Sequence, residues 1–112
     1  MISRHLTGTL SADFDSLNNA QLVEQACLTA AVDANATVLN VTTHKFEPQG
    51  VTSLILLGES HLAIHTWPEL KRAMVDIATC GDHTDPVAGW RSLLKELAAE
   101  VVEMDMRVRS VA

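Results

Sequence analysis

Four consecutive segments between residues 37 and 79 carry strand patterns, and no helical periodicity interrupts them. Residues 37–43 alternate and are rich in β-branched side chains, which favours a strand. Residues 51–57 form an almost unbroken apolar run, typical of a strand that is buried on both faces. Residues 61–67 and 73–79 continue the extended pattern. A block of successive strands is not what an alternating βαβ protein contains, so the chain is expected to belong to the α+β class.

Helical patterns lie on both sides of this block. Asp15 and Ser16 offer N-cap oxygens, and apolar residues then recur at helical spacing until Asn35, which is expected to end the helix. Asp85 and Pro86 form a second helix start, because aspartate is a good cap and proline is favoured at the first helical position. The sequence therefore predicts two helices.

Two further strands are expected at the ends of the chain. Residues 4–14 read as a first strand, and residues 102–109 alternate apolar and charged side chains. The predicted order is β-α-β-β-β-β-α-β. This order favours a two-layer α/β sandwich, in which a mainly antiparallel sheet carries two helices on one face.

Composition limits the classes of function. The chain has 112 residues, and eight Lys and Arg against fourteen Asp and Glu give a net charge of −6, which argues against binding to nucleic acid. No apolar run approaches the roughly 20 residues of a membrane helix. No signal peptide is visible, so Cys27 and Cys80 are expected to be free thiols in a reducing compartment. We expect a single cytoplasmic domain over residues 1–112 that binds neither nucleic acid nor a membrane.

Polar side chains that could take part in catalysis or metal binding are concentrated between Glu59 and Asp85. A strand that ends in Gly58 and is followed at once by Glu59 and Ser60 places a hydroxyl where the backbone changes direction, and Gly58 is expected to supply the freedom for this turn. Alternation along the next strand predicts that His61, Ala63, His65 and Trp67 share one face.

The residues alone leave three interpretations of this region. The histidines and Cys80 can be structural, as satisfied ring nitrogens and a small buried side chain. A zinc site of His61, His65, Cys80 and His83 has acceptable Cys-x-x-His spacing, but the two strand histidines would lie about 13 Å apart, so no metal is expected. Covalent chemistry at the serine is the third interpretation. It cannot use a Gly-x-Ser-x-Gly elbow, because residue 62 is Leu62.

Motifs across most of the chain favour covalent chemistry. Glu59-Ser60-His61 is followed by Ile64-His65-Thr66-Trp67-Pro68-Glu69, then Asp76 and Thr79-Cys80-Gly81, with Cys80 fifteen residues after His65. Upstream lie Arg4-His5-Leu6 and Phe46-x-Pro48-x-Gly50-Val51, and downstream lies Asp85-Pro86. Together these motifs resemble the bacterial and archaeal S-adenosylmethionine decarboxylases.

The resemblance implies a self-processing proenzyme. In this family the chain is cut before the serine, so the Ser60 hydroxyl would attack the Glu59 carbonyl and convert the amide into an ester. Elimination and hydrolysis would leave a pyruvoyl group derived from Ser60, on an α chain of residues 60–112, beside a β chain of residues 1–59. His65 would remove the Ser60 α-proton, and Thr52 would supply the hydroxyl that assists processing.

The resemblance also implies the reaction. The pyruvoyl carbonyl would form a Schiff base with the substrate amine and accept electrons, and Cys80 would protonate the substrate α-carbon after CO2 leaves. Phe46 and Trp67 would line the substrate pocket, with a core position for Trp67 as the less favoured alternative, and Glu69 would bind the ribose hydroxyls. The substrate would be S-adenosylmethionine, the product would serve spermidine and polyamine synthesis, and the enzyme would be a homodimer of processed αβ units without metal.

Three departures from the family pattern bear on substrate and processing. Thr9 stands where the first strand commonly carries an acidic residue, Thr52 replaces the usual serine, and Leu70-Lys71-Arg72 replaces the usual Tyr-Gly-Tyr after the Pro-Glu pair. Two alternatives therefore stay open. The chain can be a related pyruvoyl-dependent decarboxylase of ornithine or arginine, or an unprocessed inactive homologue that serves as a binding or regulatory subunit.

Overall fold

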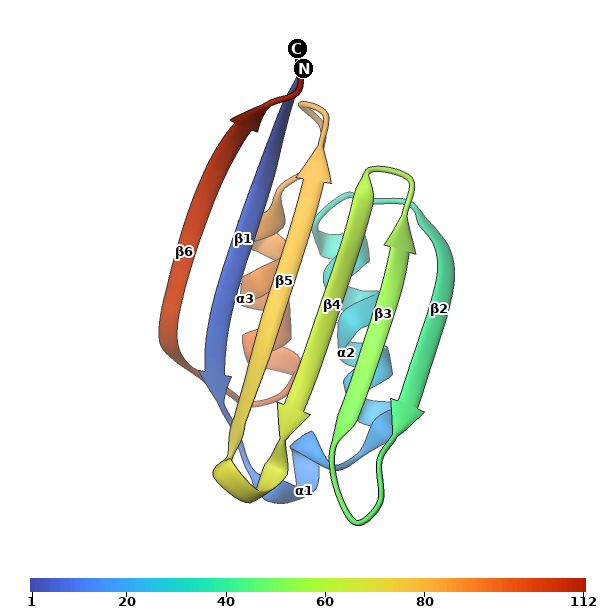
Figure 1. Cartoon of the computed structure of the whole chain (residues 1–112), viewed down its shortest axis with the longest axis vertical. Helices are drawn as coiled ribbons and strands as arrows, with labels where there is room; N and C mark the ends of the chain where they lie inside the picture. The colour runs from blue at the N-terminus through green and yellow to red at the C-terminus, as the bar shows by residue number, and fades with distance from the viewer.

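The computed structural model describes all 112 residues, and its six strands form one antiparallel sheet (Figure 1). In spatial order the strands are β2, β3, β4, β5, β1 and β6. Strands β2 to β5 are neighbours in both chain and sheet, whereas β1 lies between β5 and β6. Their bounds are Ile2–Ser11 for β1, Val38–Lys45 for β2, Val51–Leu57 for β3, Ser60–Trp67 for β4, Arg72–Cys80 for β5 and Glu100–Ser110 for β6.

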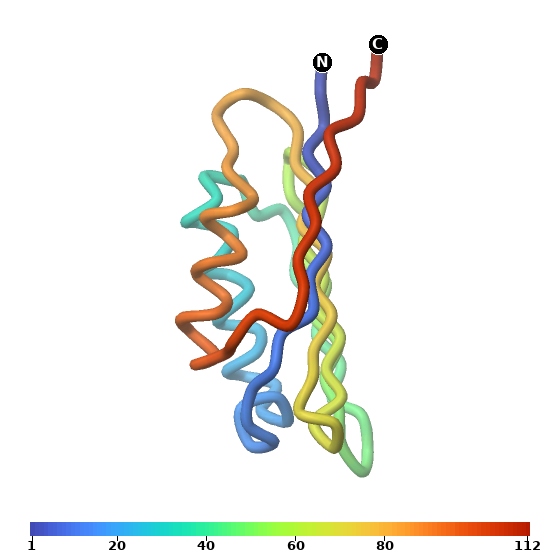
Figure 2. The backbone as a smooth tube through the Cα atoms, turned by 90° about the vertical axis from the view of Figure 1, so that its left-hand side faces the viewer, coloured from blue at the N-terminus to red at the C-terminus, as the bar shows by residue number.

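Two helices, α2 (Ala20–Asp33) and α3 (Pro86–Glu96), lie side by side on one face of the sheet, and the other face carries no layer (Figure 2). A short helix α1 (Phe14–Leu17) follows β1, and a 3-10 turn η1 (Pro68–Leu70) follows β4. The predicted α+β two-layer sandwich is confirmed. No helix is both long and apolar enough to cross a membrane.

The predicted start of the first helix is wrong, and the second is confirmed. Asp15 and Ser16 lie inside α1, while α2 begins at Ala20 and is capped by Asn19, whose side chain accepts the Leu22 N–H at 3.0 Å. The chain makes one short helical turn before the main helix, so the first polar residues do not cap it. Asp85 does cap α3, accepting the Ala88 N–H at 3.1 Å.

Two strand predictions need correction. The first strand ends at Ser11 and not at residue 14, because Phe14 begins α1. Strand β3 is not buried on both faces: alternate residues from Val51 to Leu57 are buried under the helices, but Leu54 and Leu56 are 46% and 52% exposed. Nothing in the chain covers their side of the sheet.

The core lies between the sheet and the two helices. The Trp90 side chain of α3 is buried over Gly8 of β1, and a Cβ at position 8 would lie 2.5 Å from the indole ring, so only glycine lets the helix pack this closely. Cys27 of α2 is fully buried, and burial raises the pKa of its thiol to about 12. Cys27 is therefore a packing residue, as its place in the helical stripe indicates.

Candidate active site

The turn between β3 and β4 presents Ser60 in a strained backbone conformation. Ser60 has a φ of 143°, a region that residues with a side chain rarely adopt. The positive φ falls on Ser60 itself and not on Gly58, where the sequence suggested that the freedom was needed. The Ser60 hydroxyl lies 3.1 Å from Nδ1 of His61, which gives it a neighbouring group able to accept a proton.

Glu59, on the other side of this peptide bond, is held at both its side chain and its carbonyl. Its carboxylate accepts hydrogen bonds from the Thr37 N–H at 2.8 Å, the Thr37 hydroxyl at 3.3 Å and Nε2 of His83 at 2.8 Å. The backbone bond from Thr37, followed by the bond from His83, lowers the pKa of the Glu59 carboxyl below its usual value. The Glu59 carbonyl accepts the Cys80 N–H at 3.0 Å.

Cys80 lies beside this turn at the end of β5. Its neighbour Thr79 pairs with Ser60 in the β4–β5 ladder, so the Cys80 backbone stands opposite Glu59. The thiol is free and half-buried. Glu59, Ser60 and Cys80 thus form one group, which we call the cleavage-end cluster.

The remaining predicted site residues gather at the opposite end of β4. The Thr52 hydroxyl and Nδ1 of His65 lie 3.2 Å apart, on directly paired positions of β3 and β4. Both line a cavity of about 380 Å³. The other residues around it are Phe46, Gln49, Gly50, Thr66, Trp67 and Glu69. We call Phe46, Thr52, His65, Trp67 and Glu69 the pocket-end cluster.

Buried hydrogen bonds hold the wall of this cavity. The Thr66 hydroxyl donates to the Leu17 carbonyl at 2.8 Å and accepts the Val51 N–H at 2.9 Å. The Gly50 N–H donates to the Asn18 side chain at 3.0 Å. The end of α1 and the residue after it therefore hold the start of β3 and the adjoining β2–β3 loop, which carries Phe46 at the edge of the cavity.

The two clusters do not meet within one chain. His65 is five residues along β4 from Ser60, which corresponds to about 16 Å at the usual rise of a strand. The predicted site residues thus fall into two groups: Cys80 lies beside Ser60, and four others lie around His65, namely Phe46, Thr52, Trp67 and Glu69. His65 is therefore far from the Ser60 α-proton that the resemblance predicts it to remove. Trp67 is 39% exposed, so it is not a core residue.

Comparisons with known proteins agree with this arrangement of motifs. The sequence model of the family described as S-adenosylmethionine decarboxylase matches residues 4–110. The chain belongs to the S-adenosylmethionine decarboxylase family. The S-adenosylmethionine decarboxylase proenzyme of Carboxydothermus hydrogenoformans is 42% identical over 111 residues, covering 98% of this chain and 87% of that protein. The proenzyme of the same name from Synechococcus sp. WH7803 is 48% identical over 100 residues, covering 88% of this chain and 78% of its own.

A solved structure also resembles the fold. The crystal structure of the adenosylmethionine decarboxylase from Aquifex aeolicus VF5 superposes with a TM-score of 0.83 at 29% identity. The match covers 96% of this chain and 88% of that one.

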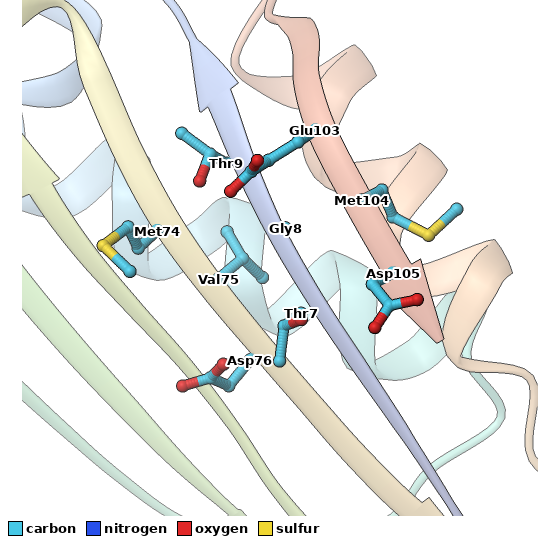
Figure 3. A pocket seen from close by; sticks show the side chains of 9 residues that line it. All are labelled: Thr7, Gly8, Thr9, Met74, Val75, Asp76, Glu103, Met104 and Asp105. Atoms are coloured by element: carbon cyan, nitrogen blue, oxygen red, sulfur yellow. The ribbon is translucent and has the colours of Figure 1, made fainter. Parts of the chain in front are cut away.

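The departures from the decarboxylase pattern occupy different places. Thr9 does not line the pocket-end cavity; it lies in a separate hollow of about 280 Å³ on the face without helices, across β5, β1 and β6 (Figure 3). Glu103 of β6 pairs with Thr9, and Asp76 and Asp105 line the same hollow, so neighbouring strands supply carboxylates there. Residues 70–72 are exposed and lead from the last residue of η1 to the first of β5, with Lys71 in a left-handed conformation at φ 55°.

Sequence reasoning missed three members of the decarboxylase's cleavage-end surroundings. From the sequence, His61 is placed on a strand face, in the Glu-Ser-His motif and in the zinc alternative, His83 only in the zinc alternative, and Thr37 only in a strand; none is given a part in holding Glu59 or Ser60. The sequence gives no sign that Thr37 and His83 contact Glu59, because they lie 22 and 24 positions from it along the chain. The four residues of the rejected zinc site do not converge, and no group of three or more His, Cys, Asp or Glu side chains could hold a metal ion.

The lowered pKa of Glu59 predicts a pH-dependent contribution to stability. In a Ser60→Ala background, which excludes any reaction of the Ser60 hydroxyl, Glu59→Gln should lower the free energy of unfolding by about 1 kcal/mol at neutral pH. A lowered folded-state pKa stabilises the fold fully above the unfolded-state pKa, and this contribution is lost as the pH falls through the folded-state value.

Urea denaturation of both chains between about pH 7 and about pH 3 measures this difference. The difference should shrink towards zero at the acid end. Asp82→Asn, at an exposed position next to His83, is the matched control. A difference that stays constant across the range would contradict the role of the Glu59 carboxylate.

Proposed function

We propose that this chain is a self-processing, pyruvoyl-dependent decarboxylase of S-adenosylmethionine that supplies polyamine synthesis. The observation that carries the proposal is the strained Ser60, whose peptide bond to Glu59 has its carbonyl held by the Cys80 N–H. The relatives named as proenzymes support it further. Both cysteines are free, which favours a reducing, cytoplasmic compartment.

The first step of processing is an N→O acyl shift. The Ser60 hydroxyl gives its proton to Nδ1 of His61, 3.1 Å away, and attacks the carbonyl carbon of Glu59. The Cys80 N–H stabilises the negative charge that develops on the carbonyl oxygen. The C–N bond then breaks, the Ser60 nitrogen takes a proton, and the amide has become an ester. Breaking this bond also releases the strain at Ser60.

The second step cuts the chain. Removal of the Ser60 α-proton breaks the Cβ–Oγ bond of Ser60, which releases Glu59 with a new C-terminal α-carboxylate and leaves dehydroalanine. Hydrolysis then releases ammonia and leaves the pyruvoyl group. The products are a β chain of residues 1–59 and an α chain of residues 60–112. The surroundings fit such a group, because residue 60 stands at a chain turn beside the half-buried Cys80. When present, the group supplies an electron sink for the electron pair that decarboxylation releases.

The chain's own residues bind the substrate and move the proton. Cys80 gives a proton to the substrate α-carbon after CO2 has left. Phe46 and Trp67 are 47% and 39% exposed around the cavity, where they offer ring faces to adenine and to the positively charged sulfonium. Glu69 accepts hydrogen bonds from the ribose hydroxyls.

A second copy of the chain is the proposed partner on the uncovered sheet face. This open face, made of the outward side chains of the six strands, exposes Leu54, Leu56, Trp67 and Met74 by 39% to 53%. Such an apolar face on a soluble protein favours an interface. Pairing two open faces also accounts for the apolar run in β3, which lacks a covering layer on one side.

Pairing completes the site. A two-fold axis that lies between two facing sheets and crosses their strands sets the cleavage-end cluster of one chain against the pocket-end cluster of the other. His65 and Thr52 of one protomer then serve Ser60 of its partner, which removes the separation of about 16 Å within a single chain. The proposed enzyme is a homodimer with two shared sites.

Self-cleavage is tested by mass spectrometry of the denatured protein. The wild-type chain should yield two fragments that result from a cut at the Glu59–Ser60 bond alone, with the pyruvoyl group on the fragment that begins at position 60. Ser60→Ala should stay intact, because it lacks the attacking hydroxyl. A single intact wild-type species after long incubation, as expected of an inactive homologue, would overturn the proposal, and so would a cut elsewhere.

The shared site is tested by complementation between two inactive chains. Ser60→Ala lacks the nucleophile and His65→Ala lacks the base, so neither homodimer should complete cleavage. In a mixed dimer, the intact Ser60 of the second chain faces the intact His65 of the first. Co-expression with distinct tags should therefore restore cleavage of the His65→Ala chain alone. Failure to restore it in isolated mixed dimers would show that the two groups do not act across an interface.

The substrate is tested by release of labelled CO2. The processed enzyme should release CO2 from S-adenosylmethionine and not from ornithine or arginine, since its pocket offers aromatic faces and Glu69 to a nucleoside. Cys80→Ala that has been cleaved should turn over at least about tenfold more slowly, because the general acid is gone. Release only from ornithine or arginine would favour the alternative decarboxylase, and unchanged turnover in Cys80→Ala would contradict its role.

A further inference from the structure

We propose that Thr37 and His83 are positioning residues for self-cleavage, and that they act by clamping Glu59 so that its carbonyl stays directed at the Cys80 N–H. The inference rests on the proposed self-processing at Ser60. It adds to the predicted machinery two residues that touch neither the hydroxyl nor the substrate.

The clamp reaches Glu59 from two segments that are distant in the sequence. One carboxylate oxygen accepts the Thr37 N–H, and the other accepts the Thr37 hydroxyl and Nε2 of His83. Bonds to both oxygens fix the plane of the carboxylate as well as its position. The side chain of Glu59 is 12% exposed, whereas that of His83 is 54% exposed, so the carboxylate is held in place while its histidine partner stays in contact with solvent. In return, the Thr37 carbonyl accepts the Gly58 N–H at 2.8 Å.

The loop after β5 is built to hold the His83 ring in place. A Cβ at Gly81 would lie 2.9 Å from two atoms of this ring, so a larger residue at position 81 would displace it. Gly81 also has a φ of 92°. The Thr84 hydroxyl donates to the Cys80 and Gly81 carbonyls, and the Asn35 side chain donates to the His83 carbonyl at 2.9 Å.

These contacts decide how the strain at Ser60 can be relieved. With its side chain clamped and its carbonyl bound to the Cys80 N–H, Glu59 cannot swing its peptide unit to bring Ser60 back to an ordinary φ. The remaining route is to break the Glu59–Ser60 peptide bond. Without the clamp, rotation of this peptide would release the strain and move the carbonyl away from its donor. The clamp therefore accelerates the acyl shift and has no part in the later elimination.

Cleavage rates of His83 variants test the proposal. Purified proenzymes are followed by mass spectrometry, with folding checked by thermal unfolding. His83→Ala should slow cleavage about tenfold, as expected for loss of one charge-assisted hydrogen bond. His83→Gln should recover most of the rate, because its amide can donate from nearly the same place as Nε2. Thr37→Val, which keeps the backbone bond, should slow cleavage less, and Asp82→Asn in the same loop should cleave at the wild-type rate.

Hydroxylamine separates the acyl shift from the elimination. This nucleophile cleaves the ester directly, forming a hydroxamate at Glu59 and leaving Ser60 as a free amino terminus, so its cleavage rate reports how fast the ester forms. Hydroxylamine should leave His83→Ala slow, since the ester itself forms slowly. Rescue of His83→Ala to the wild-type hydroxylamine rate would place the defect in elimination and overturn the proposal.

The outcomes also separate this inference from the proposed function. An intact wild-type chain would refute self-processing itself. A wild-type chain that cleaves while folded His83→Ala cleaves equally fast would refute only the clamp. A failure of His83→Gln to recover the rate, with folding unchanged, would likewise show that the donor to Glu59 is not what matters.

Discussion

The helices cover one face of the sheet, and nothing in the chain covers the other. The sheet therefore has a packed side, which contacts the helices, and the open face, which no part of the chain covers. The packed side buries alternate residues of β1, β3, β4 and β5, which fixes the register of these strands and thereby the face on which His61, His65 and Trp67 stand. The open face carries exposed apolar residues such as Leu54 and Leu56 beside polar ones. A second copy of the chain can cover these apolar residues.

Strand register has a second consequence at the turn between β3 and β4. Leu57 and Ser60 are the last paired residues of the β3–β4 ladder, so only Gly58 and Glu59 remain to reverse the chain. A two-residue connection of this kind demands unusual backbone angles, and here the unusual angle falls on Ser60 at φ 143°. Because the same ladders bring Cys80 opposite Glu59, the strain at Ser60 and the proposed oxyanion donor, the Cys80 N–H, arise from one feature of the sheet.

Local patterns predicted most of the fold and about half of the site's geometry. Alternation and apolar runs are properties of neighbouring residues, so the strands, the Asp85 cap and the shared face of His61 and His65 were readable from the sequence. Contacts that depend on topology were not. The insertion of β1 between β5 and β6, and the meeting of Thr37 and His83 at Glu59, join residues far apart in the chain. The exposed side of β3 was misread because an apolar run does not say which layer covers it.

The topology also explains how a chain can be cut near its middle without falling apart. The proposed fragment 1–59 holds β1, β2 and β3, and the fragment 60–112 holds β4, β5 and β6. In the sheet these strands interleave, because β4 pairs with β3 while β1 lies between β5 and β6. Separating the fragments would require breaking three ladders, whereas the proposed cut lies in the turn at the end of one of them. The proposed scissile bond thus lies at a residue with a strained backbone and between two fragments that the sheet holds together.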